Sequence, residues 1–310
     1  MSTQPQQSTQ AAPSTSTSAL RQWITHHPVL AYLILAFVVA WAILAVPFFS
    51  QSGIGLLPFD VPYTVFVLLA SILGLTGSAF TITALVDGRP GIRALVNRLV
   101  RWRVGIQWYL IAFFGLPLVA LLGISTGYGL TPFQALPHHG PDLLNFVVQL
   151  LVLAVLVNLW EETGWTGFML TRLQPRYGAL RSSLLIAPCF GAIHVPLIFV
   201  SGAVTTSKLT PGLVVLGILE LLVLGSVPWR VLAAWVYNNT RGSLLLLGLL
   251  HSSMDATTGA VLLPALVPGG GTYAEVFGAW AVVALLLVLL TRGRLAYQPI
   301  PDLQPVPGAA

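Results

Sequence analysis

Eight long apolar runs, separated by short polar connections, constrain this chain more than any other feature. Each run approaches the roughly 20 residues that a helix needs to cross the hydrocarbon core of a bilayer. Only 7% of the residues are charged, whereas soluble proteins carry about 25%. The sequence therefore predicts an all-α polytopic membrane protein, a bundle of about eight transmembrane helices. The predicted spans are 28–49, 61–83, 107–126, 143–164, 182–200, 211–228, 243–263 and 272–291.

These spans form a predicted transmembrane helical domain over residues 21–296, with a tail at each end. Residues 1–20 are rich in Ser, Thr, Gln and Pro, so they cannot bury enough surface to fold and are predicted to be a disordered cytoplasmic tail. Residues 297–310 are predicted to be a C-terminal tail. The first apolar run has spanning length and no cleavage site, so it is interpreted as a retained span. Pro228 could divide the segment 211–239 into a span and an interfacial piece.

The positions of the cations predict the orientation of the chain. Every arginine lies in the N-terminal tail or in alternate connections, and only Lys208 lies on the other side. By the positive-inside rule, both termini are expected to be cytoplasmic, in an integral, multi-pass protein of the cell membrane. The arginine-rich segment 88–105 has apolar residues at helical spacing, so we expect it to contact anionic lipid headgroups. Because the cations are placed in this way, we do not interpret the net charge of +5 as a sign of nucleic-acid binding.

Few ionisable side chains remain at membrane depth, and five of them fall at a similar depth on three predicted spans. They are Glu161 and Glu162 on the fourth span, His194 on the fifth, and His251 and Asp255 on the seventh. An ionisable side chain at the bilayer centre costs about 2.5 to 3.5 kcal/mol on insertion scales. Five such groups at one depth therefore indicate a single polar site.

Helical spacing indicates how these side chains face one another. His251 and Asp255 are four residues apart and share a helix face. Glu161 and Glu162 lie about 100° apart on a helix, so one can face the site while the other reaches a second partner. Each histidine taken singly could instead be a hydrogen-bonded packing residue. Glu220 lacks a partner in the sequence and is interpreted as a structural or water-contacting carboxylate, and Trp229 as an interfacial anchor.

Glutamate, histidine and aspartate side chains in a dry cavity can activate water. A buried carboxylate can take a proton from water and later deliver it to a leaving amine, which describes peptide hydrolysis. The same residue types can bind Zn²⁺, and Glu161, His194 and His251 are the candidate ligands. The pattern H-E-x-x-H of soluble zinc proteases is absent from the sequence. The residues alone leave the use of a metal open.

Three sequence motifs resemble those of a known family. EETGWTGFMLTRLQ, FGAIHVPLIF and WVYNNTRGSLLLLGLLHSSMD resemble the patterns E-E-x-x-x-R, F-x-x-x-H and H-x-x-x-N/D of the CPBP intramembrane proteases, also called the CAAX-protease and bacteriocin-processing or Abi family. That family is related to the type II CAAX prenyl endopeptidases. The patterns map onto Glu161 with Glu162, Phe190 with His194, and His251 with Asp255. The resemblance covers roughly residues 150–260, within a protease-like core at about 143–263.

The resemblance implies an intramembrane endopeptidase with a site that opens toward the cytosol. Glu161 and His194 would activate the attacking water, and Glu162 would support Glu161. His251 and Asp255 would stabilise the oxyanion or complete a metal site. The implied partner is a peptide or protein substrate, with or without a lipid. Family activities include cleavage of prenylated CAAX proteins, peptide maturation and bacteriocin self-immunity.

Two positions depart from the ideal family pattern or affect its chemistry. Thr166 stands where the family has arginine, so the cation expected one turn from Glu162 is absent. Arg172, six residues further along, could substitute only if the helix bends or ends. Asp255 is allowed by the pattern, but it can donate to an oxyanion only when protonated, whereas asparagine always can. Aspartate is the better metal ligand, which hints weakly at a metal.

Two other classes of function remain as alternatives. The missing arginine is compatible with a catalytically silent immunity or scaffold protein of the same fold. Buried Glu, His and Asp side chains also mark ion pathways, so an ion-coupled transporter is a second alternative. The sequence lacks the internal repeat that such transporters often show, which weighs against it.

Overall fold

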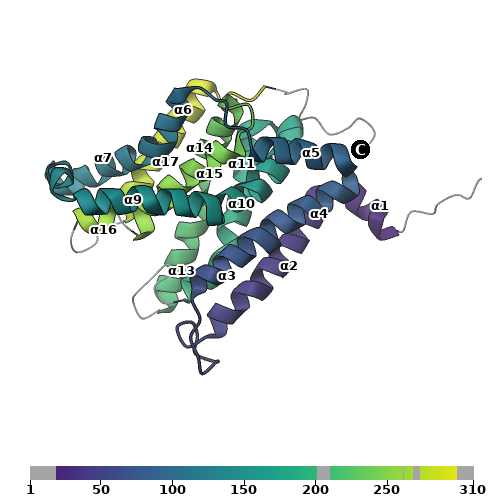
Figure 1. Cartoon of the computed structure of the whole chain (residues 1–310), viewed down its shortest axis with the longest axis horizontal. Coiled ribbons are helices and arrows are strands. Elements are labelled where there is room, and N and C mark those ends of the chain that lie inside the picture. The colour runs from purple at the N-terminus through teal and green to yellow at the C-terminus, as the bar shows by residue number, and fades with distance from the viewer. Residues whose placement is uncertain (1–18, 201–209, 261, 268–272, 299–310) are drawn as a thin grey trace, which may run out of the picture.

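The computed structural model describes residues 19–200, 210–260, 262–267 and 273–298. Figure 1 shows that these residues are almost entirely helical, and no strand occurs among them. The prediction of an all-α polytopic membrane protein is confirmed. The predicted N-terminal tail lies outside the described residues except for Ala19 and Leu20, which already belong to a helix. The predicted C-terminal tail lies outside them from residue 299 onward.

Among the residues that the structure describes, seven helices are long and apolar enough to cross a membrane. The eight predicted runs all fall on them, because the fourth and fifth runs share one 54-residue helical stretch. Gly178 breaks this stretch, with a φ of 75° and a ψ of 169° that only glycine adopts easily. An unbroken helix of that length would be about 80 Å long, far more than a bilayer core. The break therefore divides the stretch into two segments. The seven helices are Pro28–Phe49, Tyr63–Val86, Ile106–Tyr128, Gly140–Ile193, Pro211–Asn239, Leu244–Leu266 and Ala274–Thr291.

Most spans alternate ordinary α-helix with π segments, labelled η, in which the backbone winds more widely. Such segments shift the faces of the residues that follow and often occur at functional sites. The spans consist of α2 (Pro28–Phe49); α3 (Tyr63–Leu69), η1 (Ala70–Thr76) and α4 (Gly77–Val86); α6 (Ile106–Leu110), η2 (Ile111–Gly115) and α7 (Leu116–Tyr128); α9 (Gly140–Leu153), η4 (Ala154–Asn158), α10 (Leu159–Glu162), η5 (Thr163–Leu170) and α11 (Thr171–Ile193); α13 (Pro211–Leu219), η6 (Glu220–Gly225) and α14 (Ser226–Asn239); α15 (Leu244–Asp255), η7 (Ala256–Ala260) and α16 (Leu262–Leu266); and α17 (Tyr273–Thr291).

Short helices precede the first span or connect later spans. They are α1 (Ala19–His26), α5 (Gly88–Leu99), α8 (Thr131–Ala135), the 3₁₀ turn η3 (Leu136–His138) and α12 (Val195–Ile198). Pro228 does not divide the sixth span, since one helical stretch runs from Pro211 to Asn239. The π segment η6 ends just before this proline, and the Ser226 hydroxyl donates to the Leu221 carbonyl inside it.

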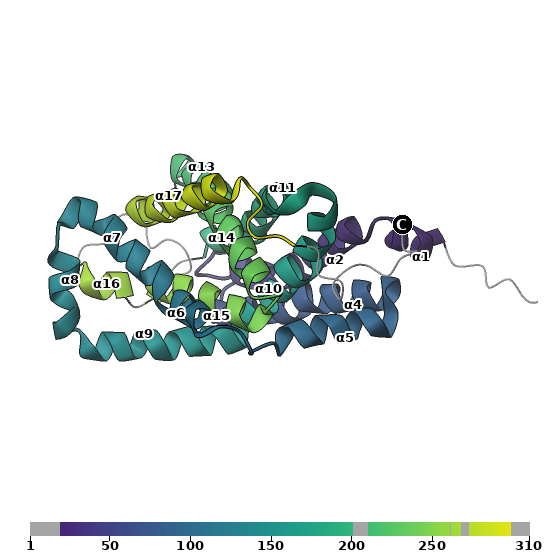
Figure 2. The same cartoon turned by 90° about the horizontal axis from the view of Figure 1, so that it is seen from above.

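Helix α15 is the centre of the bundle, because nine of its twelve residues are buried. Its start is fixed by Ser243, whose side chain accepts a hydrogen bond from the amide of Leu246 and donates to the Arg101 carbonyl. Helix α10 and the π segments η2 and η4 pack around it. Figures 1 and 2 show α2 along the helix of α3 and α4 on one side, and α17 beside α7 and α14 on the other.

Two arginines and one tryptophan that the sequence placed at the membrane surface are buried instead. Arg98 is 6% exposed and donates to the Gly167 carbonyl, and Arg230 on α14 is 1% exposed. Trp229, predicted as an interfacial anchor, is 2% exposed. The positive-inside pattern assumed that every arginine faces water, and these positions correct that assumption. The cytoplasmic location of both termini stays a prediction.

Candidate active site

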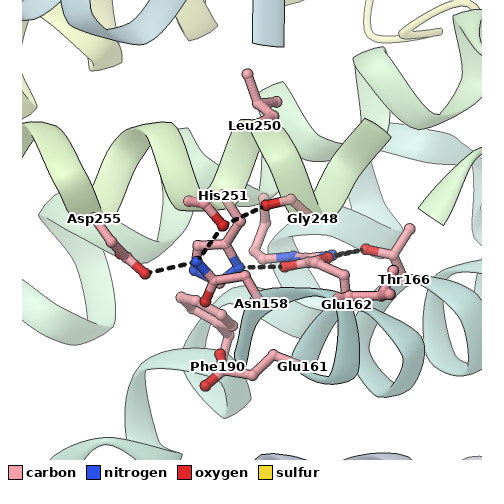
Figure 3. A network of polar contacts seen from close by, with 12 residues as sticks. Asn158, Glu161, Glu162, Thr166, Phe190, Gly248, Leu250, His251 and Asp255 are labelled. Carbon is pink, nitrogen blue, oxygen red and sulfur yellow. Dashed lines mark hydrogen bonds and ion pairs between the residues drawn. The ribbon is translucent and has the colours of Figure 1, made fainter. Parts of the chain in front are cut away.

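The five predicted site residues lie on three neighbouring helical segments. Glu161 and Glu162 end α10, a single α-helical turn between the π segments η4 and η5. His194 directly follows α11, and His251 and Asp255 lie on α15. Figure 3 shows Glu162 and His251 facing each other across the gap between two helices, with Glu161 turned to another side of α10. The two adjacent glutamates therefore have different partners.

Glu161 faces His194. Its Oε2 lies 3.8 Å from Nε2 of His194, and its Oε1 accepts a hydrogen bond of 3.1 Å from the Ser71 hydroxyl on η1. The separation of 3.8 Å is too long for a direct hydrogen bond, but a water molecule can bond to both atoms across it. The Glu161 side chain is 6% exposed and that of His194 is 23% exposed, so this pair is the accessible part of the site.

The backbone fixes the tautomer of His194. Its Nδ1 lies 2.8 Å from the carbonyl oxygen of Phe190, one turn earlier on α11. A carbonyl can only accept, so Nδ1 must carry a proton and donate it. In the neutral ring, Nε2 then presents a lone pair toward Glu161. His194 is thus set to accept a hydrogen bond from water beside the carboxylate.

Glu162 is the centre of a fully buried polar network. Nη1 of Arg230 lies 2.9 Å from both of its carboxylate oxygens. The Thr166 hydroxyl donates to Oε2 at 2.5 Å, and Nη2 of Arg230 donates to that hydroxyl oxygen, also at 2.5 Å. Nδ1 of His251 lies 3.1 Å from Oε1, in an ion pair whose atoms are not aligned for a hydrogen bond. Both carboxylate oxygens therefore have partners without solvent.

Arg230 corrects the expectation that Glu162 lacks a cation. The sequence suggested that Arg172 could substitute for the arginine missing at position 166 if the helix bends or ends. Arg172 instead forms an ion pair with Asp87 and lies over the Phe168 ring. The cation comes from α14, 68 residues from Glu162 along the chain. The missing arginine was the reason to consider a silent scaffold, and Arg230 removes that reason.

Asp255 has an amide partner that the sequence reasoning missed. The side-chain nitrogen of Asn158, on η4, lies 2.9 Å from Oδ2 of Asp255 and 2.9 Å from the Ser252 hydroxyl (Figure 3). Ser252 in turn donates to the Gly248 carbonyl. Asn158 is 1% exposed. Its polar side chain inside an apolar run, three residues before Glu161, was the signal that could have identified it.

Aromatic rings enclose the histidines. The Trp229 ring lies 4.6 Å from that of His251, centroid to centroid, and the Phe190 ring lies 5.7 Å from it. Phe190 also contacts His194, at 5.1 Å, and the guanidinium of Arg230, at 5.5 Å. Phe190 therefore separates the Glu161 pair from the Glu162 network while touching both. These rings keep the dielectric low, which strengthens the polar contacts beside them.

Two glycines allow the helices of the site to come close together. A Cβ at Gly248 on α15 would lie 3.1 Å from Cα and 3.2 Å from the backbone nitrogen of Leu159 on α10. A Cβ at Gly164 on η5 would overlap the hydroxyl of Tyr32 on α2. Both neighbours are held by packing, so a larger side chain would push the helices apart. The absence of side chains here brings His251 within reach of Glu162.

The predicted metal ligands do not form a three-ligand site. Within the described part of the chain, no group of three or more His, Cys, Asp or Glu side chains is arranged to hold a metal ion. Glu161 and His194 approach each other, but His251 faces Glu162. Metal dependence stays a prediction.

Fold and site together define a polytopic helical membrane protein with buried, paired carboxylates and imidazoles. Comparison with known proteins shows which family of membrane proteins this chain resembles. Residues 143–257 match the model of the type II CAAX prenyl endopeptidase Rce1-like family. The segment contains all five predicted site residues, so the family resemblance that the three motifs predicted is confirmed.

One curated relative supports the same resemblance. It is a CAAX prenyl protease 2 from Methanococcus maripaludis, 31% identical over 111 residues. The match covers 35% of this chain and 41% of the relative. The chain thus spans less than half the length of the relative that it matches.

Proposed function

We propose that this protein is an intramembrane endopeptidase, in which Glu161 and His194 activate water to hydrolyse a peptide bond. The observation that carries the proposal is the pairing of these two side chains at 3.8 Å, with His194 partly exposed and Glu161 nearly buried. The match of residues 143–257 to a family of prenyl endopeptidases supports it. The alternatives of a scaffold and a transporter gain no comparable support from the site.

Water between the two side chains is the proposed nucleophile. Its oxygen would lie about 2.8 Å from Oε2 of Glu161 and from Nε2 of His194, a normal hydrogen-bond length. Glu161 takes one proton as the oxygen attacks the carbonyl carbon of the substrate. His194 accepts the second O–H as a hydrogen bond and holds the lone pair of the oxygen toward the carbonyl.

Collapse of the tetrahedral intermediate completes the reaction. The carbon–nitrogen bond breaks, and Glu161 returns its proton to the leaving amine. The products are a carboxylic acid and an amine, and the carboxylate of Glu161 is regenerated. This use of one carboxylate as base and then as acid requires that bulk water be largely excluded, which the 6% exposure of its side chain allows.

His251 is proposed to stabilise the oxyanion. Nδ1 faces Glu162, so Nε2 is the nitrogen available to a substrate. With His251 protonated, the charges of Arg230, Glu162, His251 and Asp255 sum to zero, a favourable balance for a buried group. An imidazolium Nε2–H donates a charged hydrogen bond, which suits a developing oxyanion.

The proposed substrates are peptides or proteins at the membrane, with lipidated CAAX-like C-termini as the first candidates. Two facts support this class: the matched family is one of prenyl endopeptidases, and the matched relative is a CAAX prenyl protease. A site inside apolar helices also favours a substrate that partitions into the bilayer. A lipid on the substrate would supply that partitioning, at about 0.8 kcal/mol per buried methylene.

The test is peptide cleavage by the purified, detergent-solubilised protein. A library of paired lipidated and unlipidated peptides is incubated with wild type, Glu161→Ala and His194→Ala, each with and without chelator, and products are identified by mass. Glu220→Ala is the matched control, because this carboxylate lies in the spanning helix at η6 but outside the site.

We expect cleavage by wild type and by Glu220→Ala, and losses on the order of 100-fold or more in the other two variants. Loss of wild-type activity with chelator would show that a metal takes part. Undiminished cleavage by Glu161→Ala, or equal losses in Glu220→Ala, would contradict the proposal.

A further inference from the structure

We propose that Arg230 is a positioning residue that holds Glu162 against His251, and that it does so in place of an arginine at position 166. The inference rests on the proposed function for its effect on activity, but its structural part can be tested separately. The three side chains come from three different segments, α14, α10 and α15, so the arrangement exists only in the folded bundle.

Thr166 marks the place that Arg230 fills. It lies four residues after Glu162, so the two side chains share a helix face. Its hydroxyl oxygen lies 2.5 Å from both Oε2 of Glu162 and Nη2 of Arg230. The side chain of an arginine at position 166 would therefore begin beside the carboxylate of Glu162. The short threonine leaves room there for the guanidinium that enters from α14.

Only one guanidinium fits the charges of this network. The side chains of Arg230 and Glu162 are both 0% exposed. Removing one partner of a buried ion pair leaves the other without compensation, at a cost of roughly 3 to 5 kcal/mol. A second guanidinium would face the first with one carboxylate between them, which is also unfavourable. Arginine should therefore occupy position 166 or position 230, but not both.

Arg230 acts on the site through Glu162. Nη1 contacts both oxygens, so the carboxylate is held in one orientation, with Oε1 toward Nδ1 of His251. That contact leaves Nε2 as the ring nitrogen of His251 that is proposed to donate to the oxyanion. Arg230 itself contacts Phe190, not the accessible pair, so its role is to orient rather than to react.

The experiment exchanges the arginine between the two positions. Four proteins are compared: wild type, Arg230→Thr, Thr166→Arg, and the double variant Thr166→Arg/Arg230→Thr. For each, kcat and KM are measured on a peptide that wild type cleaves, and the melting temperature is measured in detergent. A fifth protein, Thr166→Met/Arg230→Thr, supplies a long but uncharged side chain at position 166. Arg172→Gln, which breaks the Asp87 ion pair, controls for the general loss of a partly buried, ion-paired arginine.

Each single variant should lose at least about tenfold in kcat with little change in KM, because the substrate does not touch Arg230. The melting temperature of Arg230→Thr should fall on the order of 10 °C. The exchange should recover most of both losses, whereas the methionine variant should recover neither. Arg172→Gln should lower the melting temperature less than Arg230→Thr does, and it should leave kcat within about threefold of wild type.

Three results would overturn the inference. The first is Arg230→Thr with the kcat and melting temperature of wild type. The second is an exchange variant that recovers neither quantity, and the third is a methionine variant that recovers as much as the exchange variant. If wild type cleaves no peptide, the proposed function fails, but the melting temperatures of the four proteins still decide whether positions 166 and 230 are coupled.

Discussion

At the residue scale, each of the two adjacent glutamates has its own environment. Glu161 faces the partly exposed His194. Glu162 is fully buried and contacts Arg230, Thr166 and His251. One carboxylate is placed to meet water, and the other is placed to hold a histidine. In the proposed mechanism, the two carboxylates therefore have different roles.

Asp255 gives a prediction at this scale. Asn158 donates to Oδ2 of Asp255, and the amide oxygen of an asparagine at 255 could accept the same hydrogen bond. Asp255→Asn should therefore keep kcat/KM within about tenfold of wild type, whereas Asp255→Leu should lose about 100-fold because it removes one of the two hydrogen-bond partners of the buried Asn158 amide. Steady-state kinetics on one peptide checks both. Equal activity of Asp255→Leu and wild type would show that this side chain plays no part.

At the element scale, π segments and glycines position the site. The turn that carries both glutamates lies between η4 and η5, and η6 precedes the buried part of α14. Each π segment shifts the face of the helix that follows, so the side chains of α10 and α14 meet in a register that a regular helix would not give. Gly248 then lets α15 approach α10 closely enough for contact.

Gly248→Ala tests this close approach. The new Cβ would meet the backbone of Leu159, which cannot move as a flexible side chain would. We expect the free energy of unfolding to fall by about 1 to 3 kcal/mol, and the melting temperature to fall by several degrees. We also expect a lower kcat, because His251 would move away from Glu162.

Gly278→Ala on α17 is the matched control, because a Cβ there has no atom within 4 Å among its described surroundings. This substitution should be neutral or stabilising by up to about 1 kcal/mol, since alanine favours helix. A Gly248→Ala protein as stable and active as Gly278→Ala would contradict the packing argument.

The sequence predicted the spans well and the inner contacts poorly, for a physical reason. Hydropathy reports the cost of placing a residue in lipid, so runs such as 28–49 and 107–126 matched helices Pro28–Phe49 and Ile106–Tyr128 within two residues. The motifs identified side chains that repeat at helical spacing. Arg230 could not be found in this way, because its register toward Glu162 depends on π segments and on packing between helices distant in sequence. A charge count alone assigned it to the surface.

At the scale of the whole molecule, the arginines that remain exposed still predict a cytoplasmic location for both termini. Arg93 lies on the exposed face of α5, and Leu130, in the connection after the third span, is 67% exposed. The topology places these two connections on opposite sides of the membrane. It follows that α5 should lie on the inner surface, where basic side chains meet anionic lipid.

Cysteine labelling tests this topology. Cys189 is the single cysteine of the chain, so Cys189→Ser gives a background without thiols. Arg93→Cys and Leu130→Cys are introduced separately, and intact cells are treated with a membrane-impermeant maleimide. We expect labelling at position 130 in intact cells, and at position 93 only after permeabilisation. The reverse pattern would show that the orientation is inverted.

In the proposed mechanism, Glu161 takes the proton from the attacking water. The most direct measurement is the ratio of kcat/KM for wild type and Glu161→Gln, an isosteric change that removes the base. We expect a decrease of about 10²- to 10⁴-fold with an unchanged melting temperature. A folded Glu161→Gln protein that cleaves the peptide as fast as wild type would show that Glu161 is not the base.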